Sequence, residues 1–268
     1  MVVVAHPGDE SFGFAGAIAS AATEGAYVVV VCVTRGWFDS RLTVASPLPG
    51  GKNRDVKDAS INWRNLDTVR EDELRRSVAL LGVRVVRMLD YAEGDLDRVD
   101  FDQLVARIVE PIRMHRPEVI LTFGPDGITG DTDHVVLSRA VSTAYRLAAE
   151  PLAYEDDLEE DQVAWRAAKL YQLVVPQERV AEVLGDRAPT EGFGSPVEPT
   201  LALELGDLAQ LKLAAISRHV SQTGSSGPFH DWDPSAREAW LSTEHYRLAA
   251  SVFGRPAQAE SSLFDGLP

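Results

Sequence analysis

The first 34 residues alternate between apolar runs and a helix-forming segment, and this pattern constrains the fold more than any other feature of the sequence. Residues 2–5 are apolar and mostly β-branched, which predicts a short buried strand. A proline and a glycine follow, and small residues from about 12 to 24 predict a helix that Gly25 would end. The β-branched run Tyr27–Thr34 predicts a second strand, buried on both faces. Strand, helix and strand joined by short turns form a βαβ unit, so we expect a parallel sheet.

Strand and helix patterns continue to alternate through the rest of the chain. Apolar residues at three- and four-residue spacing predict helices, and short apolar runs predict strands. The helices are expected at about 68–81, 101–115, 132–149, 207–220 and 235–242, and the strands at 83–89, 119–123, 169–175 and 201–205, the last at a sheet edge. A segment at 245–253 closes the fold. We therefore predict one α/β domain over residues 1–268, Rossmann-like, with a largely parallel sheet of about five strands and helices on both faces.

The stretch from about 36 to 67 departs from this alternation. It is polar, contains Trp37 and Trp63, and is longer than the usual connection between elements of a compact domain. It leaves the carboxyl end of the second predicted strand, the edge of an open α/β sheet at which ligands bind. We interpret it as a lid-like loop over a binding site, with a disordered surface insertion as the alternative.

Charge and cysteine content narrow the partners and the compartment. The 268 residues include 41 acidic and 26 basic side chains, a formal net charge of -15, which disfavours binding to nucleic acid or to anionic membranes. The single cysteine, Cys32, lies in an apolar run and is predicted to be a buried hydrophobic residue. We see no signal peptide and no apolar window near the roughly 20 residues of a membrane span, so we expect a cytoplasmic protein. The oligomeric state stays open, a homo-oligomer included.

Five polar residues follow two strands that should be neighbours. His6 and Asp9 lie in the turn after the first strand, and Asp131, Asp133 and His134 lie in the glycine-rich loop after the strand at 119–123. In the common strand order 3-2-1-4-5 these two strands are adjacent, so all five side chains would face one crevice. Two imidazoles and a carboxylate, with coordination positions left open, are the ligands of a catalytic zinc that activates water. Helix capping is the alternative explanation for Asp131 and Asp133.

Short motifs spread along the chain also occur in a known family. They are Ala-His-Pro-Gly-Asp-Glu at 5–10, Val-Thr-Arg-Gly at 33–36, Arg-x-x-Glu at 70–73, Leu-Gly-Val at 81–83, Pro-Asp-Gly at 125–127, Asp-Thr-Asp-His at 131–134, and a lysine at 212 with His-Val-Ser-Gln at 219–222. In this order they resemble A-H-P-D-D-E, T-x-G, R-x-x-E, L-G-V, P-D-G, H-P-D-H and K with H-x-S-Q of the LmbE-like, or PIG-L, zinc-dependent N-deacetylases. The resemblance spans about residues 2–222, and the chain is identified as a member of that family.

The resemblance implies roles for individual residues. The metal ligands of the family fall on His6, Asp9 and His134, and all three are present here. The helix arginine that contacts substrate falls on Arg70. The acidic substrate contact after the third strand falls on Glu93.

The resemblance breaks at positions that the family uses for acid–base chemistry. The family's general base is the first aspartate of H-P-D-D, and here Gly8 occupies that position. The histidine that stabilises the oxyanion or protonates the leaving amine falls on Asp131, and Trp37 replaces an acidic residue often found after T-x-G. Asp133 matches the aspartate of H-P-D-H. We therefore predict Asp131 and Asp133 as catalytic residues, with Asp131 as the base and Trp37 beside the substrate.

Three readings of this pattern remain open. In the first, the chain is a deacetylase or related amidase whose acid–base work has moved to Asp131. In the second, it is a pseudoenzyme that binds metal and a small ligand without hydrolysing it. In the third, the retained metal supports different chemistry on a related substrate. We favour the first: hydrolysis dependent on Zn²⁺, or on another divalent transition metal, that removes an acetyl or acyl group from an amino sugar or related N-acyl conjugate.

Overall fold

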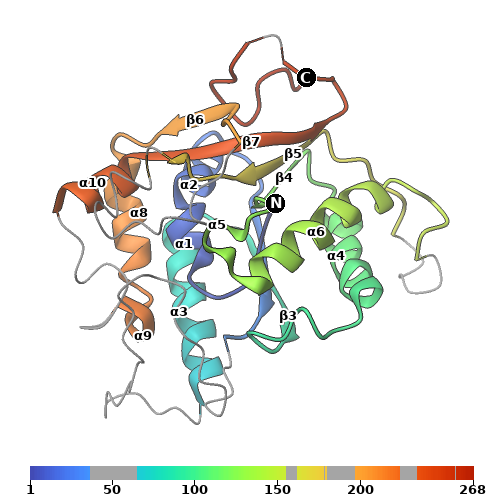
Figure 1. The fold of residues 1–268 in the computed structure, drawn as a ribbon, viewed down its shortest axis with the longest axis horizontal. Helices are drawn as coiled ribbons and strands as arrows, with labels where there is room; N and C mark the ends of the chain where they lie inside the picture. The colour runs from blue at the N-terminus through green and yellow to red at the C-terminus, as the bar shows by residue number, and fades with distance from the viewer. Residues whose placement is uncertain (37–64, 155–161, 178, 180–196, 224–233, 257) are drawn as a thin grey trace.

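The computed structural model of the chain describes residues 1–36, 65–154, 162–177, 179, 197–223, 234–256 and 258–268. A seven-stranded sheet lies at its centre, in the order β3-β2-β1-β4-β5-β7-β6 (Figure 1). The strands are β1 (Val2–Val4), β2 (Val29–Thr34), β3 (Val85–Tyr91), β4 (Val119–Phe123), β5 (Lys169–Leu173), β6 (Leu201–Glu204) and β7 (Thr243–Ser251). Strands β1 to β5 pair in parallel, so the predicted strand order 3-2-1-4-5 is confirmed.

Helices cover both faces of the sheet, as predicted (Figure 1). On one side, α8 (Leu208–Ile216) packs against α1 (Asp9–Gly13), α2 (Ala15–Thr23) and α3 (Leu66–Leu80). On the other side, α4 (Phe101–His115) packs against α6 (Thr132–Leu147). The remaining described helices are α5 (Gly127–Gly130), α9 (Val220–Thr223) and α10 (Pro234–Ser242).

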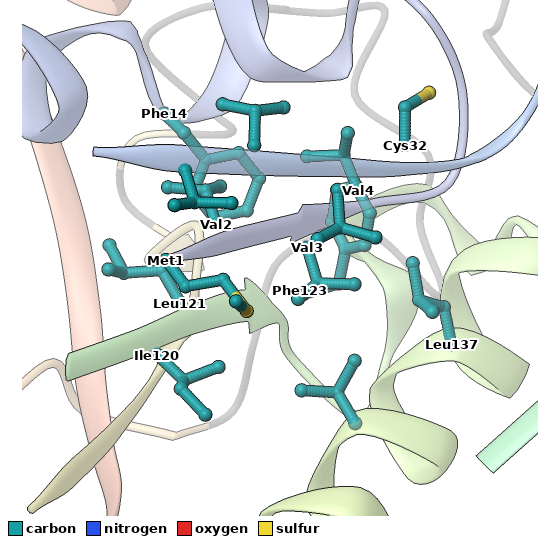
Figure 2. Packing of buried hydrophobic residues seen from close by; sticks show 14 of the residues in the cluster. Met1, Val2, Val3, Val4, Phe14, Cys32, Ile120, Leu121, Phe123 and Leu137 are labelled. Carbon is teal, nitrogen blue, oxygen red and sulfur yellow. The ribbon is translucent and has the colours of Figure 1, made fainter. Parts of the chain in front are cut away.

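The central strands consist of β-branched residues because helices cover both of their faces. Every residue of Val2–Val4 and of Val29–Thr34 is buried. Figure 2 shows the β1 side chains in one cluster with Phe14, which lies between α1 and α2, and with Phe123 at the end of β4. Cys32 is fully buried, which confirms its prediction as a core residue. This packing fixes the carboxyl ends of β1 and β4, from which the functional side chains emerge.

The first helix differs from its prediction. A single helix was expected from about 12 to 24, but α1 already begins at Asp9 and the chain bends at Phe14 before α2. The bend places the Phe14 ring in the core, edge-on to Phe123 at a centroid distance of 5.5 Å. Because α1 starts inside the turn that follows β1, Asp9 lies in the first turn of a helix that is itself anchored in the core.

Strands β6 and β7 extend the sheet beyond the five expected parallel strands. Residues 201–205 were correctly predicted as an edge strand, whereas β7 falls in a segment for which no strand was predicted, and it pairs antiparallel with both β5 and β6. The alternation of β7 is hidden in the sequence because its buried positions include polar side chains. The Glu244 carboxylate accepts hydrogen bonds from the backbone N–H groups of Gly16 and Ala17 at the start of α2, and pairs with Lys212 at 2.9 Å. These contacts join β7 to the helices on one face.

A second buried ion pair joins the amino end of β5 to the C-terminal segment. Lys169 is only 2% exposed, and its Nζ lies 2.6 Å from Oε1 of Glu260 and 3.1 Å from the Tyr171 hydroxyl. We expect Lys169→Met to lower the free energy of unfolding by about 3–5 kcal/mol, because it leaves the Glu260 carboxylate buried without its cation. Urea unfolding at neutral pH measures this change. Adding Glu260→Gln to the variant should recover part of the loss, whereas a loss below about 1 kcal/mol would show a pair as weak as an exposed one.

Some sequence predictions fall outside these described residues. Most of the predicted lid-like loop, residues 37–64 with both of its tryptophans, is in this group. None of the helices in the described part of the chain is both long enough and apolar enough to cross a membrane.

Candidate metal centre

The side chains predicted to meet do so where β1 and β4 end. These strands are parallel neighbours in the sheet, so the turn at residues 5–9 and the loop at residues 124–134 leave from the same edge. The loop passes through α5 and enters α6, whose first turn contains Asp133 and His134. Side chains separated by more than 120 positions in the sequence therefore meet, as the strand order predicts.

The two imidazole rings are held in fixed orientations by bonds on their outer sides. His6 Nε2 lies 2.9 Å from Oδ2 of Asp133, which leaves Nδ1 of His6 facing Asp9 at 3.6 Å. His134 Nδ1 lies 3.2 Å from the carbonyl oxygen of Gly127, and its ring stacks on Phe123 at a centroid distance of 3.9 Å. Each ring thus points one nitrogen toward the same space, and the ring centroids are 5.1 Å apart.

Two carboxylates border that space. Asp9 Oδ2 lies 3.3 Å from Nε2 of His134 and 3.6 Å from Nδ1 of His6, and also accepts a 2.7 Å hydrogen bond from the His6 backbone N–H. Asp131 offers a second oxygen, because ligand atoms of His6, Asp131 and His134 all lie within 4.8 Å of one another. The carboxylate of Asp131 also caps α6, since its Oδ1 accepts from the backbone N–H groups of Asp133 and His134. The helix cap predicted as the alternative role of Asp131 is thus present, and the same residue belongs with His6 and His134 to a group that could hold a metal ion.

The electrostatics of this cluster favour positive charge. Burial by itself would lower the pKa of the His6 imidazole, but neighbouring carboxylates raise it to about 10, with the charge of Glu93 and the hydrogen bond to Asp133 contributing most. Burial opposes ionisation of Asp9, yet the adjacent His134 and His6 lower the pKa of its carboxyl group to about 2. The pKa of His134 is likewise raised, against the effect of burial, by Asp9. Carboxylates that stabilise an imidazolium here would also stabilise a bound cation.

The donor set fits a divalent transition metal. The Nε2 atom of His134 is buried and has no hydrogen-bond partner among the described residues. A buried imidazole nitrogen that makes no hydrogen bond and faces a carboxylate is suited to bind a cation. Imidazole and carboxylate groups together suit zinc and neighbouring transition metals better than magnesium or calcium, which prefer oxygen ligands alone.

Asp133 supports this site from behind. It is 1% exposed and accepts hydrogen bonds from the backbone N–H groups of Gly94 and Leu96 as well as from His6. These bonds lower the pKa of its carboxyl group in spite of burial, so it stays ionised beside the imidazole. The loop after β3 and the loop after β4 are thereby joined through one carboxylate.

Two of the three residues predicted to bind substrate form an ion pair with each other. Arg70 on α3 forms an ion pair with Glu93, which lies on the loop after β3. The Arg70 guanidinium also donates to the carbonyl oxygens of Gly36 at 3.0 Å and Pro7 at 3.1 Å, and to Oε1 of Gln222 at 3.2 Å. Arg70 is only 8% exposed and connects four segments at the carboxyl edge of the sheet. The third predicted substrate residue, Trp37, lies outside the described part of the chain.

Comparison with known proteins identifies the family. The family model PIG-L, described as GlcNAc-PI de-N-acetylase, matches residues 1–145. The chain belongs to the PIG-L family.

Relatives of the PIG-L chain extend the match over its whole length. A 1D-myo-inositol 2-acetamido-2-deoxy-α-D-glucopyranoside deacetylase of Streptomyces griseus is 30% identical over 294 residues, which cover 100% of this chain and 88% of that protein. Among solved structures, an N,N'-diacetylchitobiose deacetylase from Pyrococcus horikoshii superposes with a TM-score of 0.68 at 18% identity, covering 92% of this chain and 82% of that one. The 4-carboxy-2-hydroxymuconate hydratase of Pseudomonas putida has a TM-score of 0.65 at 16% identity and coverages of 97% and 98%. At these identities the two structures show a shared fold.

The departure from the PIG-L pattern at position 8 has a structural counterpart. Gly8 has φ of 113°, a backbone conformation that residues with a side chain rarely adopt. A Cβ atom built there would lie 2.8 Å from Nε2 and 3.0 Å from Oε1 of Gln222. The amide of Gln222 therefore fills the space into which a side chain at position 8 would point.

Gln222 had no predicted role, although it lies in one of the motifs that resemble the family. Each polar residue of His-Val-Ser-Gln at 219–222 bonds to a different partner near the site. His219 lies 2.6 Å from Oε1 of Glu10, and both residues are fully buried. The Ser221 hydroxyl and backbone N–H both donate to Glu73. The motifs at 70–73 and 219–222 thus contact each other. This contact could not be predicted because the two motifs lie far apart in the sequence.

Proposed function

We propose that this protein is a metal-dependent amide hydrolase that removes an acetyl or acyl group from an amino sugar or a related N-acyl conjugate. The observation that carries the proposal is the convergence of His6 Nδ1, His134 Nε2 and the Asp9 carboxylate on one space, in which the buried His134 Nε2 lies 3.3 Å from Asp9 and makes no hydrogen bond to the described residues. Membership of the PIG-L family supports the reaction class. The substrate class rests on the name of the Streptomyces griseus relative, a deacetylase of an acetamido sugar conjugate.

His6, Asp9 and His134 would hold the metal, for which we propose Zn²⁺. When bound, zinc polarises an amide carbonyl and lowers the pKa of water toward about 7. The chain's own contribution is to hold both imidazole rings in the rotation that turns one nitrogen of each toward the metal. Asp133 does this for His6, and the Gly127 carbonyl together with the Phe123 ring does it for His134.

Asp131 is the proposed general base. Its Oδ1 atom is held by the two capping N–H groups, which leaves Oδ2 to accept a proton from the attacking water. Asp133 is a positioning residue in this scheme, because its carboxylate is buried and bonded to His6 and to two backbone N–H groups. Glu93 is partly exposed, at 21% for its side chain, and would contact the hydroxyl groups of the sugar while Arg70 holds it in place. Trp37 would lie beside the substrate in the lid-like loop.

One observation favours a second function. At position 8 the chain has no carboxylate, and the neutral amide of Gln222 fills the adjacent space. If Asp131 serves only as the α6 cap, the site retains its metal ligands but lacks a base, and the protein would bind metal and an amino-sugar ligand without hydrolysing it.

Acetate release from a panel of N-acetylglucosaminyl conjugates distinguishes these functions. We expect zinc-loaded protein to release acetate and chelator-treated protein to release none until zinc is restored. If the zinc-loaded protein binds these conjugates without releasing acetate, while Gly8→Asp combined with Gln222→Ala does release it, the protein is a binding protein and the hydrolase proposal is wrong.

A further inference from the structure

The segment 219–222, here called the strap, lies across the metal-ligand turn at residues 6–9. Three acidic or basic side chains fix it: Glu10 through His219, Glu73 through Ser221, and Arg70 through Gln222. Two of these anchors lie on α3 and one on α1. The strap is therefore attached at three points to the elements that surround the turn.

Gln222 is the strap residue that touches the turn itself. Its Nε2 donates a 2.7 Å hydrogen bond to the carbonyl oxygen of Pro7, the residue that follows the ligand His6. Its Oε1 accepts from Arg70, whose guanidinium donates to the same Pro7 oxygen. Pro7 O thus receives two donors, which fix the peptide between Pro7 and Gly8.

The place of Gln222 depends on the absence of a side chain at position 8. Its Nε2, Oε1 and Cδ atoms lie 2.8, 3.0 and 3.2 Å from the point where a Cβ of residue 8 would stand. A carboxylate at position 8 and the present position of Gln222 exclude each other. Gly8 and Gln222 therefore act as a pair.

We propose that Gln222 is a positioning residue for the metal centre, which through Pro7 holds the turn that presents His6 and Asp9, and that Gly8 is glycine to admit it. The proposal rests on the metal binding proposed above, and it deepens it by assigning a residue that touches no metal. An amide suits this position because it donates to a carbonyl oxygen and accepts from a guanidinium at once. Glutamate could keep the contact with Arg70 but would place a carboxylate against the Pro7 oxygen.

Zinc affinity, measured by competition with a chromogenic chelator, tests the positioning role. We expect Gln222→Glu and Gln222→Met each to weaken zinc binding by about 10- to 100-fold, the usual effect of losing a residue that orients metal ligands. The exposed strap residue Val220 supplies the control, since Val220→Ala should bind zinc as the wild type does. If both Gln222 variants bind zinc as tightly as the wild type, or if the added charge of Gln222→Glu tightens binding, the positioning role is wrong.

A double-mutant cycle tests the pairing without any metal. Gly8→Ala should lower the melting temperature of metal-free protein both by backbone strain and by the clash with Gln222. In a Gln222→Ala background only the strain remains, so the decrease caused by Gly8→Ala should be smaller. Equal decreases in both backgrounds would contradict the pairing. Failure of the wild type itself to bind zinc would instead contradict the proposed function. The cycle would then test only the contact between Gly8 and Gln222, independently of metal binding.

Discussion

Asp131→Asn should lower the rate of acetate release by about 10²–10⁴-fold, the range expected when a general base is lost. Asparagine is chosen because its side-chain oxygen can still accept from the N–H groups of Asp133 and His134, so the α6 cap is preserved. The melting temperature should therefore change little. Steady-state kinetics on zinc-loaded protein should show the loss in kcat rather than in KM, because the proton is transferred only after substrate is bound.

Asp131→Ala separates the cap from the base. This variant should show the same loss of activity as Asp131→Asn. It should also be about 1 kcal/mol less stable, because alanine cannot cap the helix. If Asp131→Asn keeps the wild-type rate, the base lies elsewhere and Asp131 is only a cap. A rate lost in proportion to lost zinc in Asp131→Asn would mean that this carboxylate is a metal ligand rather than the base.

His134→Gln should weaken zinc binding by more than about 100-fold, because changes that merely orient metal ligands already cost 10- to 100-fold. The variant removes a buried imidazole nitrogen that faces Asp9 and makes no hydrogen bond to the described residues. Acetate release should fall in proportion to the zinc content of the sample. Metal analysis after gel filtration, with activity measured on the same samples, tests both expectations.

His115→Gln is the matched control for this variant. His115 lies at the end of α4, next to β4's amino end and away from the carboxyl edge that holds the site. It should keep both zinc and activity. Equal zinc retention in His134→Gln and His115→Gln would remove His134 from the metal centre.

The parallel core of the fold could be predicted from the sequence because a continuous apolar run indicates a strand that is buried on both faces. The runs in β1, β2 and β4 contain almost only apolar residues, and their order was taken from the common order of doubly wound sheets. The antiparallel β7 was missed for the opposite reason. Its buried residues include Glu244, which is stabilised by Lys212 and by two N–H groups of α2, and such long-range partners leave no local pattern.

The site was predictable where it depends on strand order and hidden where it depends on side-chain contacts. His6 and His134 follow neighbouring strands, so topology alone brings them together. The ion pair between Arg70 and Glu93 was not predicted, because each was assigned separately to the substrate. The relation between Gly8 and Gln222 was hidden as well. From the sequence, Gly8 indicates only that the aspartate of the family motif is missing, and it does not show that the Gln222 side chain lies at that position.

Zinc affinities of Asp9→Asn and Asp131→Asn, compared in one titration, test most directly which carboxylate is a metal ligand and which is the general base. Both carboxylates border the same two imidazoles, and each variant replaces one carboxylate by a neutral amide. We expect Asp9→Asn to lose zinc and Asp131→Asn to keep zinc while losing acetate release. Retention of zinc by Asp9→Asn together with its loss from Asp131→Asn would contradict the proposed site.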